Sequence, residues 1–160
     1  MKKLITLVAA LTLSASAFAE VVVDHPYARA VPPGQPNSAA FMSLKNNSNE
    51  EVALVSASTS VAEVAELHTH THADGVMKMR RIPQITLHAN SEVELKPGGL
   101  HIMLIGLKRD LAKDEMIDLT LNFSDGSSEK LDIQVMDVMA GMGNMKMQHD
   151  HDMNKNIQPQ

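Results

Sequence analysis

The sequence predicts an all-β protein, a sandwich or barrel built from short strands. Between residue 21 and about residue 138, short extended segments alternate with turn residues, and few stretches are long and periodic enough for a helix. Seven or more short strands at this spacing are typical of a β-sandwich or barrel. No internal repeat or second domain is evident, so residues 20–138 are expected to form one domain.

Runs of residues that favour turns separate several of the expected strands, at 32–34, 45–50, 74–75, 97–99 and 125–126. The strands are expected over residues 21–23 with 27–31, 39–44, 52–55, 62–72, 76–82, 85–87, 91–95, 101–107, 117–123 and 131–138.

The Asp125-Gly126 pair marks the last hairpin, and the flanking apolar residues constrain its register. The apolar sets on the two strands can share a face only if the residue numbers of each cross-strand pair add up to an even number. This condition requires an odd-length loop or a bulge. These sets are Leu119, Leu121 and Phe123 on one strand and Leu131, Ile133 and Val135 on the other.

The Asp74-Gly75 pair marks another hairpin, for which a two-residue turn is expected. Such a turn would bring the His residues of the first strand and the Met residues of the second onto the same face of the sheet. The expected cross-strand pairs are Ala73 with Val76, His72 with Met77, and His70 with Met79.

The first 19 residues predict a cleavable signal peptide. Two lysines follow Met1, an apolar run occupies residues 4–13, and small residues lead to a cleavage point after Ala19. No later stretch approaches the roughly 20 apolar residues that a membrane span requires. We therefore expect an exported, periplasmic domain that does not insert into the membrane.

Composition excludes several functions. Without residues 1–19 the formal charge falls from −5 to −7, which argues against nucleic acid or an anionic membrane surface as a partner. The chain has no cysteine, so a blue-copper electron-transfer centre, thiol-disulfide chemistry and a Cys nucleophile are excluded. No recognisable Ser-His-Asp context is present, and an enzyme is not expected.

Four residues form the principal candidate metal site. Met79 would lie diagonally across the hairpin from His68, at a backbone separation of roughly 7–8 Å that long side chains can bridge. His101 and Met103 are two residues apart on a third strand and project together. Thioether sulfur binds Cu(I) well and Zn(II), Mg(II) or Ca(II) poorly, so a His2Met2 set favours Cu(I).

The remaining His and Met residues of the domain have simpler interpretations. His70 and His72 are either accessory ligands or solvent-facing residues, and we prefer the second interpretation. Met42, Met116 and Met136 lie among apolar neighbours and are expected to fill space in the core.

The spacing of His68, Met79, His101 and Met103 resembles the H-x10-M-x21-H-x-M signature of the periplasmic copper chaperone family known as PCu(A)C. The similarity extends to the runs at residues 74–80 and 95–104 and covers nearly all of the mature domain. It implies a cupredoxin-like Greek-key β-sandwich whose Cu(I) ligands are these four residues.

The resemblance also implies a destination for the copper. The family delivers copper toward the CuA centre of cytochrome c oxidase, so the expected partners are the CuA domain of oxidase subunit II and Sco-type proteins. A periplasmic copper buffer or resistance protein without a specific acceptor is the alternative. The domain itself is expected to be a monomer.

The C-terminal segment, residues 139–160, is predicted to be a flexible Met/His-rich tail. Some members of the same family are similar in carrying such an extension, which implies additional copper binding, including Cu(II) through histidines. A purely solubilising or linker role remains open. The candidate tail ligands are Met142, Met145, Met147, His149, His151 and Met153.

Overall fold

The computed structural model describes residues 20–137, and all regular secondary structure in this range is β-strand. The predicted signal peptide and the predicted Met/His-rich tail lie outside the described residues. The described part of the chain contains no helix that could cross a membrane. The all-β prediction is therefore confirmed for the domain.

Ten strands lie within residues 20–137, and each of them corresponds to a predicted segment. The first is continuous where two pieces were expected, because a bulge between Asp24 and Tyr27 carries the chain through Pro26. The strands are β1 (Val21–Arg29), β2 (Asn37–Asn46), β3 (Val52–Ser58), β4 (Ala62–Ala73), β5 (Val76–Arg81), β6 (Ile85–Leu87), β7 (Ser91–Leu95), β8 (His101–Leu107), β9 (Met116–Phe123) and β10 (Ser128–Met136).

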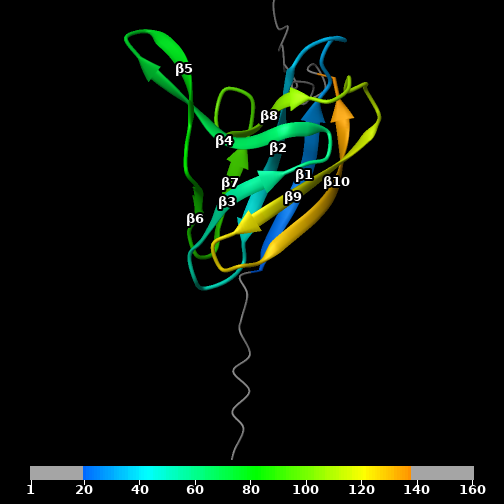
Figure 1. Ribbon diagram of the computed structural model, residues 1–160. Coiled ribbons are helices and arrows are strands. Elements are labelled where there is room, and N and C mark those ends of the chain that lie inside the picture. Colours follow the sequence, from blue (N-terminus) through cyan, green and yellow to red (C-terminus); the bar gives the residue numbers. More distant parts are fainter. Residues whose placement is uncertain (1–19, 138–160) are drawn as a thin grey trace, which may run out of the picture.

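The strands pair in the order β5-β4-β8-β2-β1-β10-β9-β3-β6, and β7 pairs separately with β2. An additional pairing of β3 with β4, through Ala57 and Ala65, closes the strands from β4 to β3 in this order into a ring. Only β1 and β10 pair in parallel among these strands. The β4–β5 hairpin projects from the body of the domain (Figure 1).

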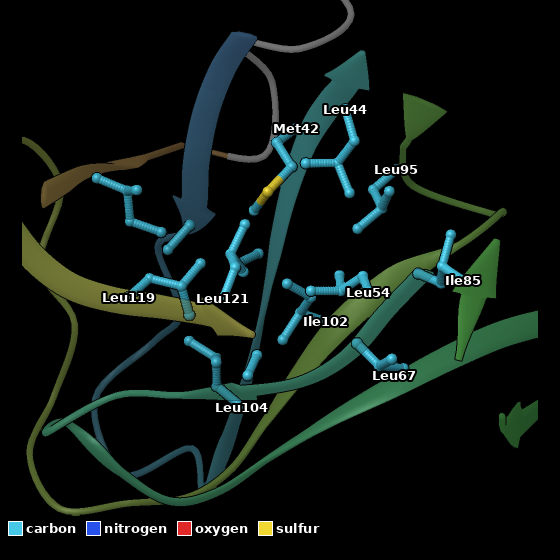
Figure 2. Close-up of a cluster of buried hydrophobic side chains, with 14 of the residues drawn as sticks. Met42, Leu44, Leu54, Leu67, Ile85, Leu95, Ile102, Leu104, Leu119 and Leu121 are labelled. Carbon is cyan, nitrogen blue, oxygen red and sulfur yellow. The ribbon is translucent and has the colours of Figure 1, made fainter. Parts of the chain in front are cut away.

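The core lies inside this ring and consists mainly of Leu, Ile and Val side chains (Figure 2). Met42 is 2% exposed and packs in the core, as predicted. Met116 is 55% exposed, so its predicted core position is wrong. The reason is parity: Met116 directly precedes the buried Ile117, and consecutive residues of a strand point to opposite faces.

The hairpin between β9 and β10 has the predicted odd loop. Leu119 pairs with Leu131, and residues 124–126 form a three-residue connection closed by a hydrogen bond from Phe123 N–H to the Ser127 carbonyl. Gly126 has φ of 86°, the left-handed conformation that the last residue of such a loop requires.

Asn46, at the end of β2, is fully buried and joins three parts of the chain. Its Nδ2 donates to the carbonyls of Glu50, Leu87 and His88 at 2.7, 3.1 and 3.2 Å. Its Oδ1 accepts hydrogen bonds from the backbone N–H and the hydroxyl of Ser48. This one buried side chain therefore satisfies backbone carbonyls next to β3 and β6, of which the Leu87 carbonyl is buried.

Candidate metal centre

The β4–β5 hairpin has the predicted two-residue turn. Asp74 and Gly75 have φ of 53° and 74°, and both values are positive, as a type I′ turn requires. His70 pairs with Met79, and Met79 therefore lies diagonal to His68. The register inferred from Asp-Gly is confirmed, and the His and Met side chains share one face of the hairpin.

Strand β8 brings the second half of the candidate site against β4. His101 lies directly opposite His68, and Met103 lies opposite Glu66. The alternate residues Ile102 and Leu104 are fully buried in the core. His101 and Met103 therefore project from the outer face of β8, toward the same side as the hairpin donors.

A pocket of about 270 Å³ lies on this face. Met79, His101 and Met103 line it together with His70, and Phe41 contributes part of the wall. His101 is only 3% exposed, whereas Met79 is 47% exposed. The pocket thus has a buried imidazole at its base and an accessible thioether at its rim.

The backbone at the 97–99 turn fixes the orientation of the His101 ring. His101 Nδ1 lies 3.0 Å from the Gly99 carbonyl oxygen. Because a carbonyl can only accept, Nδ1 carries the proton and Nε2 keeps its lone pair. An outer hydrogen bond of this kind is the usual means of fixing the tautomer of a metal-binding imidazole.

His68 is held from a different side. Its Nε2 lies 2.8 Å from Glu66 Oε2, and Glu66 also lies 3.4 Å from Arg81. The hydrogen bond from His68 is the main reason that the pKa of Glu66 is lowered. Among the described residues, His68 Nδ1 is the one buried side-chain nitrogen or oxygen without a hydrogen-bond partner. A buried acceptor without a partner is costly, and a metal ion would satisfy it.

The structure therefore brings together three of the four predicted residues around one pocket and places His68 beside them. The His68 and His101 ring centroids are 5.8 Å apart. His70 is half-buried and lines the pocket, so the preferred solvent-facing interpretation is wrong for His70; His72 is exposed, as expected. The predicted tail ligands lie outside the described residues.

Sequence reasoning missed Glu66 and the Gly99 carbonyl as groups that orient the imidazoles. Glu66 lies two residues before His68, and this spacing places both on one face of β4. The contact was therefore visible in principle. The Gly99 carbonyl carries no such signal, because a backbone group has no sequence signature.

Burial lowers the pKa of His101, with nearby His70 and His68 contributing in the same direction against the Gly99 hydrogen bond, which raises it. We expect the apo domain to show a His101 titration midpoint below the usual value of about 6.5. As the pH falls, this histidine is protonated in the unfolded chain before it is protonated in the folded domain. Proton binding therefore favours the unfolded state, and the free energy of unfolding should fall as the pH drops through about 6.5. NMR titration of the His101 ring tests this, with the urea-unfolded chain as control. A midpoint at or above that of the unfolded chain would contradict it.

A family model and a related sequence with similar descriptions match this chain. A family model described as "Putative lipoprotein LpqE-like" matches residues 21–135. A protein of Leifsonia xyli named "Putative lipoprotein Lxx21020" is 35% identical over 114 residues, which cover 71% of this chain and 69% of the relative. The uncharacterized protein RP573 of Rickettsia prowazekii is 31% identical over 100 residues, or 62% of this chain and 55% of its own length.

Solved structures resemble the domain closely enough to confirm its fold. The apo form of DR1885 from Deinococcus radiodurans is 34% identical with a TM-score of 0.58, covering 86% of this chain and 91% of that chain. Its Cu(I) form is 35% identical with a TM-score of 0.60, over 78% and 85% of the two chains. The copper-bound PCuAC domain of PmoF2 has a TM-score of 0.63 over 76% and 96% of the two chains and, at 21% identity, supports the fold alone. The expected cupredoxin-like single-domain fold is confirmed.

Proposed function

The chain belongs to the LpqE-like family, and from that membership and the His/Met pocket we propose that it carries copper(I) in the periplasm and hands it to another protein. The observation that carries this proposal is the convergence of Met79, His101 and Met103 on one pocket. Two neutral sulfurs beside an imidazole suit Cu(I) better than any hard divalent cation. The similarity to DR1885, which has been solved in a Cu(I) form, supports the same ion.

We propose His68, Met79, His101 and Met103 as the ligands. His101 would bind through Nε2, because its Nδ1 proton is held by the Gly99 carbonyl. His68 would bind through Nδ1, the buried nitrogen that lacks a partner, because its Nε2 faces Glu66. All four ligands are neutral, so the bound ion keeps its positive charge and favours a site that is open to solvent on one side.

Transfer requires that an acceptor reach the ion. Met79 is the accessible ligand, because it is 47% exposed on the projecting β5 strand. An incoming ligand could replace this thioether first while His101 still holds the ion. This geometry favours a carrier, because one proposed ligand is accessible at the rim while another is buried.

The CuA domain of cytochrome c oxidase subunit II, or a Sco-type protein, is the proposed acceptor. A copper buffer without a specific acceptor is the second candidate, and the Met/His-rich segment 139–160 favours it, since closely spaced ligands capture metal with little geometric selection. In either case that segment would hold additional copper, including Cu(II) at its histidines.

Deleting residues 139–160 is expected to leave one tightly bound Cu(I) per domain, because the pocket ligands all lie within residues 20–137. The measurement is a titration under reducing conditions against a chromophoric Cu(I) chelator, with the mature full-length protein as control. The full-length protein should bind further, weaker equivalents. Loss of all tight binding on deletion would assign the site to the tail instead.

A transfer assay separates the two candidate functions. The Cu(I)-loaded protein is mixed with an apo CuA domain or with a chelator of matched affinity, and copper loss is followed over time. Faster transfer to the protein acceptor than to the chelator is expected for a chaperone. Equal rates would favour the buffer.

A further inference from the structure

His70 is the imidazole that the family spacing omits and the pocket includes. Its side chain lines the pocket with Met79, His101 and Met103, and it pairs directly with Met79 across the hairpin. Its ring centroid is 5.1 Å from that of His101, which is closer than the 5.8 Å between His68 and His101. His70 is therefore in position to supply a donor to the same ion.

The Gly99 carbonyl orients His70 in the same way as His101. His70 Nδ1 lies 3.3 Å from this oxygen, and His101 Nδ1 lies 3.0 Å from it. A carbonyl oxygen has two lone pairs and can accept from both rings. Both imidazoles then carry the proton on Nδ1, which leaves Nε2 of each free to bind a metal ion.

His68 and His70 are held by different groups and therefore offer different ring nitrogens. Glu66 holds His68 at Nε2 and leaves Nδ1 as its donor, whereas His70 presents Nε2. Within residues 20–137, no three His, Cys, Asp or Glu side chains are grouped so that they could hold one metal ion together. One ion held by His101 and two thioethers can thus take a further imidazole from His68 or from His70.

Resting on the copper(I) role proposed above, we propose that His70 is an exchange ligand: the ion, held by Met79, His101 and Met103, passes between His68 Nδ1 and His70 Nε2. One copper–nitrogen bond forms as the other breaks, and no electron moves. No proton moves either, because His68 keeps its proton toward Glu66 and His70 keeps its proton toward Gly99. The exchange shifts the ion two residue pairs toward the exposed end of the hairpin, from the His68–Arg81 pair to the His70–Met79 pair, where an acceptor can reach it.

The test compares His68→Gln, His70→Gln and the double variant, since glutamine is polar and of similar size but lacks the imidazole. Each single variant should lower Cu(I) affinity by less than about tenfold, because the other imidazole substitutes. The double variant should lose roughly a hundredfold or more, which exceeds the combined single losses. His72→Gln is the matched control, because His72 is exposed on the same face and does not line the pocket. The Cu(I) affinity of this variant should equal that of the unsubstituted protein.

A second measurement needs no substitution. Two-dimensional 1H–15N spectra of the imidazoles should show the Nε2 resonance of His70 shifting when Cu(I) is added, while His72 stays unchanged. The inference is overturned if that resonance stays fixed, or if His70→Gln has no effect even in the His68→Gln background. Failure of the unsubstituted protein to bind Cu(I) would overturn the copper function itself, and is thereby distinguishable from failure of the exchange alone.

Discussion

Replacing Met79 and Met103 together with leucine is expected to lower Cu(I) affinity by roughly a hundredfold or more, since loss of groups that merely orient ligands already costs about 10–100-fold. Leucine is apolar and of similar volume but has no sulfur to donate. Cu(II) affinity should change by less than about tenfold, because Cu(II) depends on imidazole nitrogen more than on thioether sulfur. The two residues line the same pocket, and the substitution therefore tests the soft-donor argument directly.

Met77→Leu is the matched control for that experiment. Met77 lies on the same face of β5, pairs with His72 and is 49% exposed, but it does not line the pocket. Its substitution should leave Cu(I) affinity unchanged. Chelator competition measures Cu(I) binding, and a parallel titration in air measures Cu(II). Equal losses for the two ions in the double variant would contradict the proposed ligand set.

Asn46→Ala is expected to lower the free energy of unfolding by about 2–4 kcal/mol, since one buried and several half-buried hydrogen bonds are lost at once and an unsatisfied buried group can cost about 1–3 kcal/mol. Asn46 Nδ2 donates hydrogen bonds to the carbonyls of Glu50, Leu87 and His88, and Asn46 Oδ1 accepts a hydrogen bond from Ser48. Alanine leaves these groups facing the interior. Water that enters the vacated space would reduce the loss, which places the expected value well below the sum of the separate terms.

Urea unfolding of the copper-free domain measures this change. Asn122→Ala is the control, because the Asn122 amide donates to Ser56 on the surface, where water can replace it. The control should change stability by less than about 0.5 kcal/mol. If Asn46→Ala were no more destabilising than the control, the hydrogen bonds of Asn46 would contribute little to joining β2, β3 and β6.

The pairing within each hairpin was predictable because it depends on residues close in the chain. The length of a turn and the alternation of side chains together determine which residues face each other. Asp74-Gly75 therefore placed His70 opposite Met79 from sequence alone, as the structure confirms. The alternation of apolar residues on both strands of the β9–β10 hairpin likewise predicted its odd-length loop.

The arrangement of distant strands required the tertiary structure. β8 lies between β2 and β4, a placement that depends on residues separated by tens of positions and on how the core closes. Alternation along β8 gave two faces but did not say which of them is buried. The structure decides this by packing Ile102 and Leu104 into the core, which turns His101 and Met103 outward.

The sequence alone determined the strands, the two hairpin registers and the set of soft donors from which a copper ligand can be chosen. The tertiary structure decided that His70 faces the pocket, that Glu66 and Gly99 orient the imidazoles, and that Asn46 joins three parts of the chain. The difference has one physical cause. Local geometry follows from fixed bond angles and the two-residue repeat of a strand, whereas contacts between distant segments depend on how the whole core packs.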